Sequence, residues 1–121
     1  MKELIFIILM TISFNAYGGG GGHFHPKKVA KCGNTCSAEQ IKEAAHRGVK
    51  ELVKWRKMDA KWEKSIVENI EKKTFKKSDK SLTAWVVTLS ENISTENKSK
   101  TYVFFTEDGL VFRTNSTGVL K

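Results

Sequence analysis

The sequence has few cysteines, no long apolar run and no catalytic constellation. Its two cysteines allow at most one disulfide within the chain. The longest apolar run, from Leu4 to Phe14, is shorter than the about 20 residues that a membrane-spanning helix requires. There is no nucleophile–base pair, phosphate-binding loop or paired-carboxylate arrangement. We therefore predict that the protein is not an enzyme, and only a thiol–disulfide role for the two cysteines stays open.

Positive charge is in excess. The chain of 121 residues has 21 lysines and arginines against 13 aspartates and glutamates, which is a formal net charge of +8. The length suits one domain, and a hydrophobic content of 40% is typical of a globular one. The charge favours acidic partners, such as a membrane surface, an anionic polymer, an acidic protein or a nucleic acid.

The amino terminus has the pattern of a secretory signal. Met1-Lys2-Glu3 is a short charged start before the apolar run, and Ala16-Tyr17-Gly18 supplies small residues at the −3 and −1 positions of a cleavage site. We predict that residues 1–18 are a signal peptide, with a retained membrane anchor as the alternative. After cleavage the protein would have no stable membrane anchor and would be periplasmic or secreted. Export argues against nucleic acid as a partner and lets disulfides persist.

Residues 19–36 contain most of the soft metal ligands of the chain. The run of five glycines at its start predicts a flexible segment. His23 and His25 offer two imidazoles, and Cys32 and Cys36 offer two thiolates. Two nitrogens and two sulfurs suit Zn²⁺ or Cu⁺. The segment therefore predicts a zinc or copper site.

The same segment supports other interpretations. The turn signal Gly33-Asn34 lets the flanking cysteines form a structural disulfide or cycle between redox states, and the histidines would then be solvated. If processing left Gly21 as the first residue, its amine, two backbone amides and the imidazole of His23 would form a square-planar set of nitrogens. Cu(II) and Ni(II) prefer that geometry.

The remainder, residues 37–121, is predicted to be a single α+β domain. One long amphipathic helix runs from Ala38 to about Lys57, after a capping box in the pattern Ser-x-x-Gln at Ser37. A short second helical piece is expected through about Asn69. His46 lies at the edge of the apolar stripe of the long helix, where it is either solvated or a third nitrogen ligand for the amino-terminal site.

Four antiparallel strands are predicted to form a meander against the helices. They lie at residues 71–76, 82–90, 101–106 and 110–114, with the first at an edge of the sheet. One face of the sheet packs on the helix. The other face is expected to need a cover or a partner because it carries several apolar residues, namely Val86, Val103, Phe105 and Val111.

Several short motifs resemble a known family. They are the Ser-Ala-Glu-Gln helix start and the segments 59–62, 71–75, 85–88, 102–109 and 115–118. Together they resemble a family of small exported bacterial proteins of unknown function with a His-bearing amino terminus, and the helix-then-meander order is similar to PepSY-type domains. The first resemblance implies a periplasmic, non-enzymatic protein with a metal connection. The second implies inhibition or binding of partner proteins. Cys32 and Cys36 are not part of the family pattern, and Ser116 stands where an aromatic is expected.

We expect an exported, non-enzymatic protein that binds or responds to copper or zinc through His23, His25, Cys32 and Cys36. The alternative is a PepSY-like interaction or inhibitory module for another exported protein. In that case residues 19–36 are a linker that carries a structural disulfide. A count of free thiols, with metal analysis, separates the two interpretations.

Overall fold

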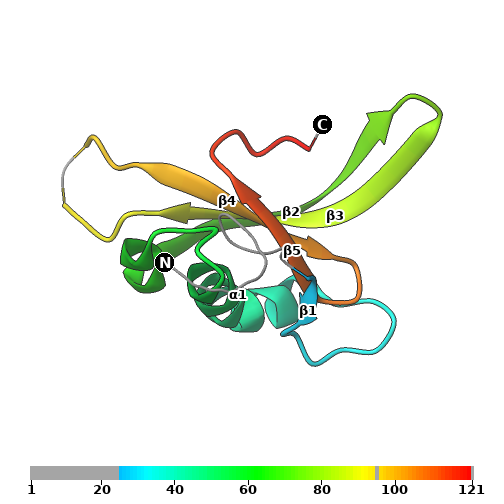
Figure 1. Cartoon of the computed structure of the whole chain (residues 1–121), viewed down its shortest axis with the longest axis horizontal. Helices are drawn as coiled ribbons and strands as arrows, with labels where there is room; N and C mark the ends of the chain where they lie inside the picture. Colours follow the sequence, from blue (N-terminus) through cyan, green and yellow to red (C-terminus); the bar gives the residue numbers. More distant parts are fainter. Residues whose placement is uncertain (1–24, 95, 121) are drawn as a thin grey trace, which may run out of the picture.

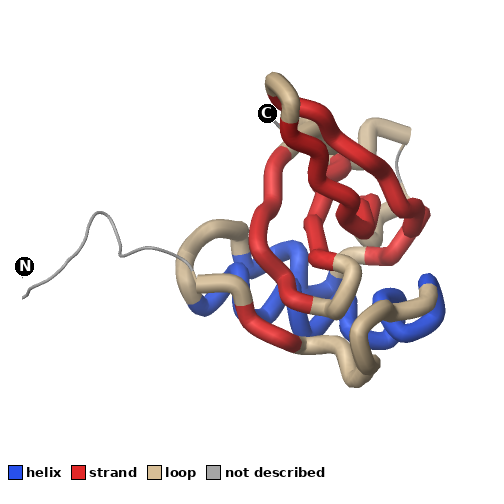
Figure 2. The backbone as a smooth tube through the Cα atoms, turned by 90° about the vertical axis from the view of Figure 1, so that its right-hand side faces the viewer, coloured by secondary structure: helices blue, strands red, loops and turns tan. Residues whose placement is uncertain are grey.

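A computed structural model describes residues 25–94 and 96–120 of the chain. They form a five-stranded antiparallel sheet with the helices against one face (Figures 1 and 2). A two-residue strand, β1, comes first in the chain, followed by helix α1, the short 3-10 helix η1 and four long strands. In chain order the elements are β1 Lys27–Lys28, α1 Ala38–Lys54, η1 Ala60–Lys64, β2 Ile66–Lys77, β3 Lys80–Ser90, β4 Lys100–Thr106 and β5 Leu110–Asn115. The strand order is β1-β5-β4-β3-β2, so β1 and β2 lie at opposite edges.

The predicted four-stranded meander is wrong in its strand count. The fifth strand is β1, which pairs with β5 and sets Lys27 opposite Val111 and Lys28 opposite Leu110. Two consecutive lysines carry no alternation of apolar and polar residues, so β1 exists only because β5 offers it backbone partners. The predicted second helical piece is also too long, because η1 ends at Lys64 and strand follows. The outline of helices packed on an antiparallel sheet remains α+β.

Helix α1 begins at a reciprocal cap and buries one face. The Ser37 hydroxyl accepts a hydrogen bond from the Gln40 amide at 3.3 Å, and the Gln40 side chain accepts one from the Ser37 amide at 2.9 Å. This satisfies two amides that a helix start leaves unpaired. The buried face packs on the sheet and consists of Ile41, Ala44, Ala45, Gly48, Val49 and Leu52. The 17-residue helix and the sheet therefore share one core.

The two faces of the sheet differ from the prediction. Register pairs Trp85 with Phe105 and Val87 with Val103, so these side chains share the face that packs on α1. Val111 lies opposite Phe105 on the same face. The prediction that Val103, Phe105 and Val111 lie on the other face with Val86 is therefore wrong.

The face away from the helices carries a smaller aromatic cluster. Phe104 is fully buried there, and its ring centroid lies 6.1 Å from that of Phe75 and 6.3 Å from that of Phe112. Phe112 reaches this face at a bulge in the pairing of β4 with β5, where it has no opposite residue. The strands thus cover this face partly with their own side chains.

Strands β2 and β3 continue past the rest of the sheet. Strand β4 pairs with β3 only as far as Ala84, whereas β2 and β3 stay paired to Lys77 and Lys80. The end of this hairpin projects from the body as a two-stranded ribbon at the upper right of Figure 1. In the part of the chain that the structure describes, β3 is the only strand that pairs with β2. The outer edge of β2 is therefore open.

No helix among the described residues is long and apolar enough to cross a bilayer.

Candidate functional site

Residues 27–36, which we call the arm, are tied to the sheet at the β4–β5 turn. The amides of Val29 and Ala30 both donate to the carbonyl of Gly109, at 3.1 and 3.4 Å, and the Cys36 amide donates to the Glu107 carbonyl at 2.7 Å. Gly109 has φ +94°, and a Cβ there would lie 2.7 Å from the Cβ of Ala30. The turn therefore needs glycine both for its backbone conformation and for its contact with the arm.

Helix α1 holds the arm from its other side. Arm and helix are joined by three polar contacts: Arg47 Nε to the Val29 carbonyl at 3.0 Å, Gln40 Nε2 to the Lys31 carbonyl at 3.3 Å, and Lys27 Nζ to Glu51 Oε1 at 3.7 Å. The arm is thus fixed between the helix layer and the sheet, although its sequence has no helix or strand periodicity.

A disulfide joins Cys32 and Cys36, whose Cα atoms are 5.3 Å apart. Cys36 is buried in the core, and Cys32 packs against that core while partly exposed. The structure therefore contains the disulfide that the turn signal between the two residues allows. In this oxidised form neither sulfur is a thiolate, which is the form that binds a metal.

The candidate histidines are not brought together in the described part of the chain. His23 lies outside the described residues, and His25 is exposed two residues before β1. His46 Nε2 forms a 2.9 Å hydrogen bond with the carbonyl of Ser65. Ser65 directly precedes β2, so His46 lies at the opposite edge of the sheet from β1. Over residues 25–94 and 96–120, no three His, Cys, Asp or Glu side chains group closely enough to hold a metal. Metal binding by His23, His25, Cys32 and Cys36 stays a prediction.

The arm creates a groove that no pattern in the sequence indicates. Two adjacent hollows of about 460 and 380 Å³ lie along the arm and α1, and we call them together the cationic groove. Its charged lining consists of Lys28, Lys31, Glu43, Arg47, Lys50 and Glu51. The charge excess of the chain is visible in the sequence. The groove is not, because residues 28–31 and 43–51 meet only when the arm packs on the helix.

The resolved pKa shifts belong to surface contacts away from the groove. A hydrogen bond with the Lys100 side chain holds the pKa of Glu68 below its usual value, and the same bond raises the pKa of Lys100. The Ser99 backbone amide lowers the pKa of Glu91. None of these groups lines either hollow, so we assign them to local structure and not to acid–base chemistry.

Comparison with known proteins gives a family but no function. Residues 1–119 match the model of a protein family of unknown function, DUF6488. No curated protein and no solved structure matches the chain.

Proposed function

Because the chain belongs to the family DUF6488, whose function is unknown, we propose a function from the structure: an exported, non-enzymatic module that binds another exported protein. The observation that carries this proposal is the open edge of β2. This strand is 12 residues long, and within the described residues it pairs on one side only, with β3. Such an edge offers a row of backbone donors and acceptors to an extended segment of a partner, the binding mode known as β-augmentation.

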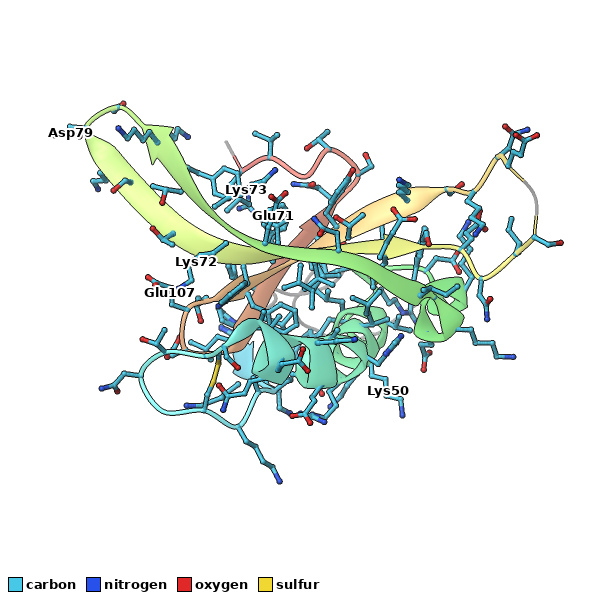
Figure 3. The ribbon with its side chains drawn as sticks, turned by 180° about the vertical axis from the view of Figure 1, so that it is seen from behind. Lys50, Glu71, Lys72, Lys73, Asp79 and Glu107 are labelled. Carbon is cyan, nitrogen blue, oxygen red and sulfur yellow. A yellow bond between two sulfur atoms is a disulfide. The ribbon has the colours of Figure 1, made fainter. Side chains whose placement is uncertain are left out.

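The charged side chains of β2 are mostly lysines and favour a partner strand with acidic or neutral side chains. Lys73 Nζ lies 3.2 Å from Glu71 and Lys72 Nζ lies 3.6 Å from Glu107, as Figure 3 shows for these labelled residues. Lys76 and Lys77 follow toward the turn of the ribbon. In two parallel, in-register copies of β2 the lysines would oppose one another, which is destabilising. A strand with acidic or neutral side chains would pair without this penalty.

The arm supports the same proposal. A disulfide at the start of the domain is compatible with an oxidising compartment, and residues 1–18 have the pattern of a signal peptide. The proposal corresponds to the PepSY-like module with a structural disulfide, except that residues 27–36 pack on the domain and are not a linker. We propose that the partner is bound or inhibited, with no covalent chemistry.

Site-specific photo-crosslinking tests the β2 edge. A photoreactive aromatic amino acid replaces Lys73 or Lys76 in the full chain, expressed with its amino-terminal segment, and Lys42 on the exposed face of α1 is the matched control position. We expect one adduct of defined mass from both β2 positions and none from position 42. Adducts of equal yield from all three positions, or from none, would contradict the proposal.

We propose metal binding by the amino-terminal segment as a second candidate function. It is favoured by the exposure of His25 two residues before β1, which leaves its imidazole accessible at the edge of the domain. His23 and His25 would bind copper or zinc through nitrogen, and Cys32 and Cys36 would join them only after reduction of the disulfide.

Calorimetric titration of the full mature protein with Cu²⁺ or Zn²⁺ tests this second candidate. We expect uptake of one ion that is lost in the double variant H23A/H25A and kept in H46A, because His46 is engaged with Ser65. Titration of the reduced protein shows whether the cysteines add affinity. The candidate is wrong if the wild type takes up no ion, or if H23A/H25A binds as the wild type does.

A further inference from the structure

The cationic groove brings together charges that are far apart in the sequence. Lys28 and Lys31 come from the arm, and Arg47 and Lys50 come from α1. Lys31 and Arg47 line both hollows, so the two hollows are adjacent. The disulfide and the contacts with Gly109 hold the arm in place, so the fold determines the spacing of these cations.

Arg47 is oriented by the arm. Its Nε donates to the Val29 carbonyl at 3.0 Å, which fixes the plane of the guanidinium group. No residue in the described ranges accepts a hydrogen bond from its two terminal amino groups. A guanidinium held in this way can donate a pair of parallel hydrogen bonds to a carboxylate.

Positive charge predominates in the groove. Two carboxylates line it beside the four cations, and one of them, Glu51, lies 3.7 Å from Lys27 Nζ. The other, Glu43, lines only the smaller hollow. An anionic ligand therefore meets a net positive lining, and Glu43 is the side chain that would oppose it.

We propose that the cationic groove binds an acidic, extended segment of a partner polypeptide, with a carboxylate on Arg47 and further carboxylates on Lys28, Lys31 and Lys50. These three lysines are exposed, so the groove is open along its length. An open trough suits a chain that passes through it, whereas small-molecule sites enclose most of their ligand. The site lies on the arm side of the molecule, on different residues from the β2 edge.

Other anionic partners fit the groove less well. Binding to a membrane surface combines charge with insertion of apolar side chains. The large exposed apolar residues of the described chain are Trp55, Ile66, Leu82, Ile93 and Val119. None of them lines the groove. Single-stranded nucleic acid is bound by stacking of its bases on aromatic rings, and no aromatic residue among residues 25–94 and 96–120 lines either hollow.

The test uses a fluorescent peptide of about eight consecutive glutamates as the probe, with anisotropy measured on the full mature protein at low salt. The groove variant K28E/K31E/K50E is compared with the control variant K57E/K64E/K98E, which makes the same change of charge on exposed lysines that line neither hollow and do not belong to β2. Both variants replace exposed side chains, and circular dichroism compares their folding with that of the wild type. We expect the groove variant to weaken binding by at least about tenfold and the control variant by less than about threefold. We also expect E43Q to strengthen binding by about twofold, because it removes the opposing carboxylate.

Several results would overturn the proposal. Equal weakening by the two triple variants would show attraction to net charge only, and stronger weakening by the control variant would place the peptide outside the groove. Absence of binding by the wild type at low salt would exclude the acidic peptide. The groove would be assigned to a membrane if the peptide did not bind and vesicles of anionic phospholipid bound the wild type but not the groove variant.

Discussion

Gly48 determines how closely helix α1 approaches the sheet. A Cβ at this position would lie 2.8 Å from the Phe105 ring and 3.3 Å from a methyl group of Val111. Gly48→Ala gains about 1 kcal/mol of helix propensity but forces these buried side chains to move, which costs about 1–3 kcal/mol. We expect a net loss of about 1 kcal/mol in the free energy of unfolding, measured by urea denaturation.

The matched control for this substitution is Gly33→Ala. No atom lies within 4 Å of a Cβ at Gly33. We therefore expect its urea midpoint to equal that of the wild type. If Gly48→Ala also had the wild-type midpoint, the Phe105 ring would move aside at no cost, and the close packing would be unimportant for stability.

Glu91 connects stability to pH. Its carboxylate accepts a hydrogen bond from the Ser99 amide at 2.9 Å, and chiefly for this reason its pKa lies below the ordinary value of 4.5. A carboxyl group with a lowered pKa in the folded state stabilises the fold above its unfolded-state pKa, and this contribution is lost as the pH falls through the lowered value. We expect the wild type to lose more thermal stability than Glu91→Gln when the pH falls from about 6 to about 3. An equal decline in both proteins would show that the Ser99 contact has no role.

Residue-level prediction from the sequence worked where the signal is local. The capping box of Ser37 and Gln40 involves neighbours along the chain, and it is present in the structure. The disulfide alternative for Cys32 and Cys36 is confirmed for the same reason. Arg47 is different, because its role depends on a carbonyl that is 18 positions away in the sequence. No pattern around Arg47 indicates that contact.

The arm is an element that depends on its disulfide. The bond closes a loop with a sequence separation of 4, for which the chain-entropy model predicts about 2 kcal/mol of stabilisation. We expect the double variant C32S/C36A to lose about this free energy of unfolding. The amides of Val29 and Ala30 should also exchange hydrogen faster, because the arm would open.

Reduction of the wild type provides the matching control. Dithiothreitol should shift the wild type to the stability of C32S/C36A and should leave that variant unchanged. If the reducing agent lowered the free energy of unfolding of both proteins equally, or of neither, the stability would not depend on the disulfide.

The prediction of strands and of their buried faces failed where tertiary contacts determine them. Strand β1 has two residues and no apolar periodicity, so only its pairing with β5 makes it a strand. In β4 the run Val103, Phe104 and Phe105 is apolar at every position, so alternation alone does not say which side chain faces the helix. The pairing of Phe105 with Trp85 settles that choice, and it appears only in the assembled sheet.

At the scale of the whole molecule, the proposed export leads to a direct prediction. We expect the protein purified anaerobically from the exported fraction to begin at residue 19 and to contain no free thiol. Intact mass spectrometry with and without alkylation measures both properties. A mass that includes residues 1–18, or two alkylated cysteines, would contradict this expectation. A chain that began at Gly21 would instead favour the square-planar nitrogen site at His23.

The strand order has a consequence for how the molecule can be used. Strands β1 and β2 are the two outermost strands, with three strands between them. A ligand that engages the chain before Lys27 and a polypeptide that lies along β2 would therefore not compete for space. The protein could carry both at once and act as a bridge between them, without any change of shape and with each affinity independent of the other.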